Sequence, residues 1–130
     1  MLGFVLTLPI LLTAYLKDES VSGFTDAIVV YRLEEMGGEA FAASATISFP
    51  AAGEVRGSAP CNSYSAQQTV PYPWFEITGI AATRRACPDL AAETEFFATL
   101  QAMTLVEVAG DLLILSDEDG AQMIFRAAQD

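Results

Sequence analysis

Short stretches in which apolar and polar side chains alternate follow one another along most of the chain. Alternation with a period of two is typical of half-buried β-strands, and turn residues such as those of Glu34–Gly38 separate the stretches. The pattern predicts a strand or tight loop over Cys61–Ser65. It predicts strands over Ala27–Leu33, Ala45–Phe49, Glu54–Ser58, Trp74–Ile80, Leu105–Val108, Asp111–Leu115 and Gln122–Arg126.

One stretch has the period of a helix instead. Phe96, Leu100 and Met103 follow i, i+4, i+7 spacing, which predicts one helix over Pro88–Met103 with an apolar stripe. Pro88 suits the first helical position, and acidic side chains suit the positive end that follows it: Asp89, Glu93 and Glu95. Seven or eight short strands and a single helix predict an α+β fold, in which an antiparallel sheet curls around the helix.

The N-terminus is apolar without alternation. Leu2–Leu16 has 15 residues, which is short for a membrane-spanning helix of ~20 residues and fits the apolar region of an export signal. We expect residues 1–23 to be a signal peptide or N-terminal hydrophobic segment, with a cut near Ser22 or Gly23. An uncleaved anchor and a buried core element are the alternatives. The remaining domain is expected over residues 27–127.

Composition narrows the function classes. The chain has 130 residues, of which 52% are apolar, so it can form one domain with a packed core. Its formal charge of −11 repels phosphate, which argues against nucleic acid partners and against adsorption to anionic lipid. Membrane contact is therefore expected only through an uncleaved N-terminal segment. The chain has no histidine, which rules out a Ser-His-Asp triad and removes the commonest zinc ligand.

Cys61 and Cys87 are the only cysteines. In an oxidising compartment two such thiols usually pair, and a bridge across 26 positions would stabilise the fold by roughly 3–4 kcal/mol. Two free buried thiols and a redox-active pair are the alternatives. Arg84, Arg85 and the following helix would lower the pKa of Cys87, but active dithiols are usually close in sequence.

Around these cysteines the chain resembles the META domain family, whose type member is the bacterial heat-shock protein HslJ. Gly57–Ala66 is similar to a Gly-x-x-Cys-Asn turn followed by an aromatic residue, and Ile80–Cys87 to a strand ending in Thr-Arg-Met-x-Cys. The acidic helix and the hairpin motif of Gly110–Leu115 follow in the order of the family. The resemblance covers roughly Ile28 to Arg126.

The resemblance implies a conical, partly open antiparallel barrel with one helix packed against it. It marks five residues as a structural motif: Gly57, Asn62, Tyr64, Thr83 and Arg84. This chain departs from the family at three positions, with Arg85 in place of methionine, Ala66 in place of a frequent glycine and Tyr31 in place of a frequent tryptophan.

Structural roles, rather than ligand binding, are expected for most polar residues of these motifs. We expect Asn62 to cap its own turn and Arg84 to pair with a carboxylate or cover an apolar edge. Asp117–Gly120 lacks the spacing of a calcium loop and is expected to be a solvated turn. The most partner-like stretch is an aromatic loop stiffened by proline, at Tyr72, Trp74 and Phe75, although Trp74 and Phe75 are expected to enter the core.

Members of this family are mostly exported or lipid-anchored envelope proteins without an assigned reaction, and some are linked to heat shock, drug tolerance or secretion. We therefore expect a non-enzymatic, monomeric envelope domain that is periplasmic or secreted, or is anchored in the inner membrane if the segment is uncleaved. It would bind an envelope protein or an apolar ligand and use no cofactor or metal. The alternatives are a lipid-binding protein similar to secretion pilot proteins and a thiol-disulfide redox protein.

Overall fold

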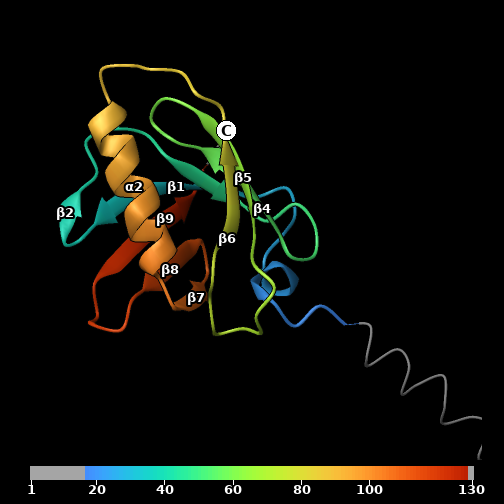
Figure 1. The fold of residues 1–130 in the computed structure, drawn as a ribbon. Helices are drawn as coiled ribbons and strands as arrows, with labels where there is room; N and C mark the ends of the chain where they lie inside the picture. The colour runs from blue at the N-terminus through green and yellow to red at the C-terminus, as the bar shows by residue number, and fades with distance from the viewer. Residues whose placement is uncertain (1–16, 129–130) are drawn as a thin grey trace, which may run out of the picture.

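Antiparallel pairing joins the strands into one curled sheet with a single α-helix against it (Figure 1). The structure is a computed structural model that describes residues 17–128. Its elements are η1 (Val21–Phe24), β1 (Val30–Met36), β2 (Glu39–Ala40), β3 (Thr46–Ser48), β4 (Glu54–Ser58), β5 (Ser63–Gln67), β6 (Thr78–Ala82), α2 (Leu90–Ala102), β7 (Leu105–Ala109), β8 (Leu112–Ser116) and β9 (Gln122–Ala127). The strand order is β6-β5-β4-β3-β1-β9-β8-β7, and β2 pairs with β1 beside this path.

The two edge strands of the sheet, β6 and β7, approach each other at one end. The segment that precedes β6 pairs with β7 there: Val106 N donates to Pro73 O at 2.8 Å and Phe75 N donates to Thr104 O at 2.9 Å. These bonds join the two edges of the sheet at this end. This curled antiparallel half-barrel with one helix confirms the predicted fold class.

The helix fills the concave side of the sheet. Phe96, Leu100 and Met103 are buried, as their spacing predicted. The Phe96 ring centroid lies 5.9 Å from that of Tyr64 on β5 and 6.3 Å from that of Phe41. Burying such side chains contributes about 1.5–3 kcal/mol each, so the helix and the sheet depend on each other for stability.

Several element boundaries differ from the sequence prediction. The first strand continues through the predicted turn to Met36, because Gly37 and Gly38 alone form the turn, with φ of +64° and +84°. The strand predicted from Trp74 begins at Thr78, because Trp74 forms a bridge with Leu105 instead. The helix begins at Leu90 rather than Pro88, after a turn in which Leu90 N donates to Cys87 O.

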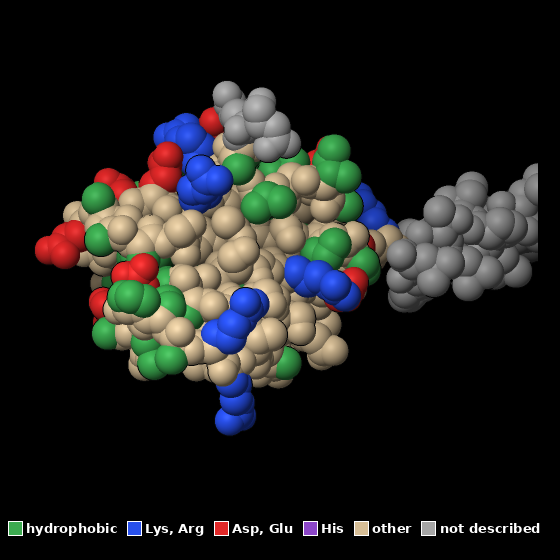
Figure 2. Space-filling model, turned by 90° about the horizontal axis from the view of Figure 1, so that it is seen from above, with side chains coloured by type: hydrophobic (Ala, Val, Ile, Leu, Met, Phe, Trp, Pro, Cys, Tyr) green, Lys and Arg blue, Asp and Glu red, His purple; other side chains and the backbone are tan. Residues whose placement is uncertain are grey.

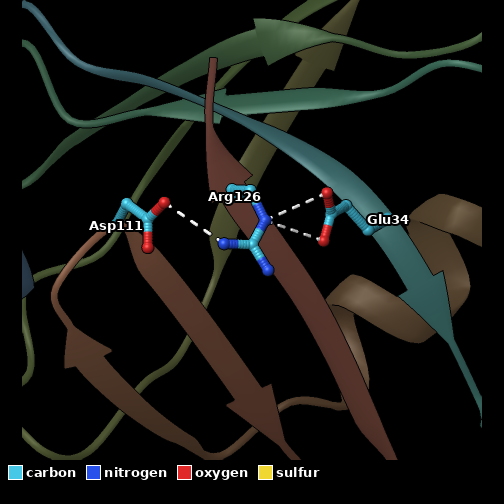
Figure 3. Close-up of polar contacts among 3 residues, drawn as sticks. All are labelled: Glu34, Asp111 and Arg126. Atoms are coloured by element: carbon cyan, nitrogen blue, oxygen red, sulfur yellow. Dashed lines mark hydrogen bonds and ion pairs between the residues drawn. The ribbon is translucent and has the colours of Figure 1, made fainter. Parts of the chain in front are cut away.

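Two exposed ion pairs that share Arg126 connect β1, β9 and the residue before β8 (Figure 3). Arg126 on β9 donates through Nε to the Glu34 carboxylate on β1 and through Nη1 to Asp111 beside β8, each at 3.2 Å. These bonds raise the pKa of the Arg126 guanidinium. Arg32 lies directly opposite Arg126 across the ladder, so the carboxylates also offset a like-charge contact.

The charged side chains are distributed over the surface. Figure 2 shows Lys and Arg side chains spread over the upper face, with Asp and Glu side chains beside several of them. Because solvent screens exposed pairs of this kind, they contribute little to stability.

The predicted signal segment, Leu2–Leu16, lies outside the described residues. The residues around the expected cut near Ser22 or Gly23 contact the rest of the domain. Val21 is 0% exposed and belongs to the core. Asp18 Oδ1 accepts from Ser20 N at 3.0 Å, and Ser22 Oγ accepts from Gly53 N at 3.2 Å. A cut at the predicted place would remove a core side chain.

The Asp18 carboxylate is stabilised at neutral pH. Partial burial alone would raise the pKa of Asp18, but the hydrogen bonds from Ser20 and Ser22 outweigh it and lower that pKa. The contribution of these bonds to stability is therefore retained at neutral pH and lost only as the pH falls through the lowered pKa of Asp18.

Within residues 17–128, no helix has the length and apolar character needed to cross a bilayer.

The role of Val21 can be measured by urea unfolding. Val21→Ala should lower the free energy of unfolding by about 2 kcal/mol, because it leaves a cavity in the core. Ile28→Ala is the matched control, since Ile28 is 86% exposed, and should change stability by less than about 0.5 kcal/mol. Equal, small effects of the two substitutions would show that the segment is not part of the core.

Candidate functional site

The two cysteines form a disulfide bond. Cys61 follows β4 and Cys87 precedes α2, and their Cα atoms lie 5.6 Å apart. The bond therefore ties the turn between β4 and β5 to the start of the helix. Both cysteines are partly exposed.

Asn62 is the buried centre of this region. Its Nδ2 donates to Arg85 O at 3.0 Å and to Glu93 Oε2 at 2.7 Å. Its Oδ1 accepts from Arg85 N at 2.6 Å and from Thr83 Oγ1 at 2.9 Å. Two donors and two acceptors are all that an amide side chain offers, so Asn62 is fully satisfied.

This arrangement corrects the expectation that Asn62 caps its own turn. The backbone closes that turn, with Ala59 N donating to Asn62 O at 2.7 Å. The Asn62 side chain instead contacts the Thr83–Arg85 segment and the helix. Asn62 thus holds three chain segments together.

Glu93 supplies the helix side of this network. Its side chain lies in the first turn of α2 and the residue is 6% exposed. Besides accepting from Asn62, Glu93 accepts through Oε1 from Cys61 N at 3.0 Å. The sequence interpretation assigned Glu93 only to the helix terminus. The missed signal is its place on the apolar stripe, three and seven positions before Phe96 and Leu100.

Thr83 and the two arginines contribute unequally. Thr83 donates its hydroxyl to Asn62, whereas Arg85 contributes only backbone atoms and leaves its side chain exposed. The departure from methionine at Arg85 is therefore compatible with the network. Arg84 is exposed, and among the ion pairs of residues 17–128 it has no carboxylate partner, whereas the expectation that it covers an apolar edge stays a prediction.

Gly57 and Tyr64 form a second part of the motif. They lie opposite each other on β4 and β5, and Tyr64 Oη donates to Thr46 O on β3 at 2.7 Å. A Cβ atom on Gly57 would lie 2.7 Å from Tyr64 Oη and would collide with Thr46 O. Only glycine leaves room for this bond. Burial raises the pKa of Tyr64, so the phenol stays a neutral donor.

The predicted aromatic loop is divided between core and surface. Phe75 is buried, as expected, but Trp74 is 58% exposed, so the expectation that both enter the core is half wrong. Tyr72 Oη accepts from Val108 N at 3.0 Å, and its ring stacks on Phe24 at a centroid distance of 4.2 Å. We define the aromatic surface as Phe24, Tyr72, Trp74 and Leu105.

Hollows on the described surface are open and polar in part. One of about 480 Å³ lies on the outer face of β4, β5 and β6, where small side chains such as Ser65 and Ala81 flank Arg56.

Asp117–Gly120 is a turn in which Asp117 Oδ1 accepts from Asp119 N and Ala121 N, both at 2.9 Å. Among residues 17–128, no three acidic, Cys or His side chains are grouped to hold a metal ion.

The close approach at Gly57 can be tested by adding one methyl group. Gly57→Ala should lower the free energy of unfolding by about 1–3 kcal/mol, because the methyl group displaces Tyr64 or β3. Ser58→Ala, on the exposed neighbouring position, is the control and should change stability by less than about 0.5 kcal/mol. An unfolding midpoint for Gly57→Ala that matches the control would contradict this role of the glycine.

The Asn62–Glu93 pair can be tested by a double-mutant cycle in urea. Asn62→Asp places two carboxylates together and should lower the free energy of unfolding by about 3–5 kcal/mol. Glu93→Gln points an amide N–H group at another hydrogen-bond donor and should lower it by about 1–3 kcal/mol. The double variant restores one amide–carboxylate bond. It should therefore be more stable than the sum of the two losses, with a coupling energy of about 1–3 kcal/mol.

The exposed Glu95 provides the control on the same helix, and Glu95→Gln should be nearly neutral. If the effects of Asn62→Asp and Glu93→Gln simply add, the direct bond between these side chains is not what stabilises the helix against the turn.

Two solved structures are similar to this chain. An NMR structure of a protein from Burkholderia xenovorans matches with a TM-score of 0.64 and 17% identity, over 85% of this chain and 88% of that one. A second protein solved by NMR matches with a TM-score of 0.59 and 19% identity, over 75% of this chain and 87% of that one. At these identities the similarity shows the fold alone.

No curated protein matches the chain. A family model does: the META domain matches residues 27–130, which includes the cysteine pair, the Asn62 network, the helix and the closing hairpins. With most of its length covered by that model, the chain belongs to the META domain family.

Proposed function

We propose that this protein is an exported, non-enzymatic META domain of the bacterial envelope, which acts in stress tolerance or envelope assembly by binding. The observation that carries the proposal is the Cys61–Cys87 disulfide, because such bonds persist in oxidising compartments such as the periplasm. Export also agrees with the apolar segment at the N-terminus.

The surroundings of the disulfide favour a structural role over a redox role. Cys61 N is held by Glu93, and the neighbouring Asn62 spans the same two segments that the disulfide joins. A redox cycle would have to break and re-form this disulfide while buried hydrogen bonds keep the two cysteine segments in place. The thiol-disulfide alternative therefore has no observation that favours it.

Binding at the surface is better supported than binding inside the barrel. Large side chains fill the space between sheet and helix, and Phe96, Leu113, Leu115 and Phe125 are all 0% exposed. This packing favours an external contact over an internal lipid. The aromatic surface is the best candidate, since Trp74, Phe24 and Leu105 expose apolar groups on a hydrogen-bonded frame.

The compartment and the bond can be tested together. We expect non-reducing peptide mapping of the protein from an envelope fraction to find Cys61 and Cys87 in one cross-linked peptide pair. Dithiothreitol should not reduce the bond in the native protein under conditions that reduce it after unfolding. Reduced protein recovered from the cytoplasmic fraction would overturn the proposal.

Removal of the bond supplies a second measurement. Cys61→Ala with Cys87→Ala should lower the free energy of unfolding by roughly 3–4 kcal/mol, the chain-entropy value for a loop of this size. The variant should still fold, because the Asn62 and Glu93 bonds join the same segments. Unchanged stability would contradict a structural role for the disulfide.

A further inference from the structure

We propose that the aromatic surface of Phe24, Tyr72, Trp74 and Leu105 rests on a lipid bilayer, beside the apolar segment Leu2–Leu16 as a retained anchor. The inference rests on the proposed function, since it names the binding partner of the same surface. The partner is the surface of a membrane that is mainly zwitterionic.

The first argument is the short distance along the chain between the apolar segment and the fold. Asp18 is fixed by its bonds with Ser20 and Ser22, so Lys17 alone separates the fixed chain from Leu16. Two residues span at most about 7 Å. If Leu2–Leu16 is embedded in lipid, the end of the domain that carries η1 must lie against the headgroups.

The second argument is the chemistry of that end. Tyr72 N donates to Glu19 O at 2.8 Å, which ties the aromatic loop to the first residues of the fold. Phe24 stacks on Tyr72 and is 51% exposed, and Trp74 and Leu105 are bridged and exposed next to them. Figure 1 shows η1 and β7 at the same lower end of the molecule.

Aromatic side chains are the residues that membrane interfaces select. Trp and Tyr rings are enriched at the level of the headgroups, where one part of the ring is apolar and another is polar. Here they project from a loop that backbone bonds hold to β7 and to the chain at Glu19. The surface can therefore enter the interface without ordering a flexible segment first.

Charge and length specify the kind of contact. The net charge of −11 and the exposed Glu19 disfavour anionic lipid, so apolar contact with zwitterionic lipid should dominate and should depend little on salt. The apolar segment has 15 residues, fewer than the ~20 that a membrane-spanning helix needs. An anchor of that length gains from a second contact at the surface.

The folded N-terminal residues explain why the anchor would be retained. A cut near Ser22 or Gly23 would extract Val21 from the core and break the bonds of Ser20 and Ser22. A chain that keeps these residues keeps these contacts, so retention of the segment agrees with the packing of the domain.

Trp74 is a direct reporter because the chain has a single tryptophan. The full chain should be reconstituted into phosphatidylcholine vesicles, with and without bromine on the acyl chains near the headgroup. We expect the emission of Trp74 to shift to the blue relative to the chain in detergent-free buffer, and to be quenched by the brominated lipid. Phe24→Asp should reduce both effects.

A second reporter controls for non-specific quenching. In Trp74→Phe with Leu90→Trp, the fluorophore stands at the start of α2, which Figure 1 places at the opposite end from η1. Leu90 is 44% exposed, so the position accepts a large side chain. We expect its emission to be insensitive to brominated lipid.

Each remaining outcome overturns the inference. Failure of the full chain to associate with the vesicles excludes the lipid partner, and vesicle-bound protein with unquenched Trp74 or equal quenching of both reporters excludes this orientation. These results would leave the exported, disulfide-bonded domain intact as a proposal, because peptide mapping of the envelope fraction tests that separately.

Discussion

The fold depends on one buried side chain, Asn62, whose four hydrogen bonds connect segments that are far apart in sequence. A buried amide costs free energy unless each donor and acceptor is paired, so the segments that pair with it are constrained together. The Thr83–Arg85 segment, the Cys61 turn and the first turn of α2 must meet at this point. The disulfide and the position of the helix follow from that meeting.

The rest of the barrel is arranged around the same constraint. Once Glu93 fixes the start of the helix, Phe96 and Leu100 are directed into the concave sheet, and Phe96 meets Tyr64 edge-on. Tyr64 in turn reaches β3 across Gly57, which requires a position without a side chain. A polar centre, a packed helix and a close strand contact thus stabilise one another, which is the consistency between levels expected of a sequence with one fold.

The parts that could be predicted from sequence are those with local periodicity. The strands and the helix were predictable because alternation and the Phe96–Leu100–Met103 spacing each report one buried face. The role of Glu93 was not predictable, because a glutamate near a helix N-terminus can either stay exposed as a charge or be buried as a hydrogen-bond acceptor. The residue type is the same in both cases. The partner of that acceptor is Asn62, 31 positions away in sequence, and no local pattern contains that distance. Trp74 was placed in the core for a related reason, since its bridge to Leu105 depends on how the sheet curls.

The distribution of these features over the molecule bears on function. Both donors and both acceptor sites of the Asn62 side chain are paired within the protein, so this side chain holds the fold together. Three of the large apolar side chains that remain exposed, Phe24, Trp74 and Leu105, lie on the aromatic surface, which backbone bonds connect to Glu19 near the start of the described chain. This arrangement supports our proposal that the aromatic surface contacts an apolar or interfacial partner. In the META domain described here, the well-marked motif residues therefore report the architecture, and the poorly marked aromatic surface is where binding is to be sought.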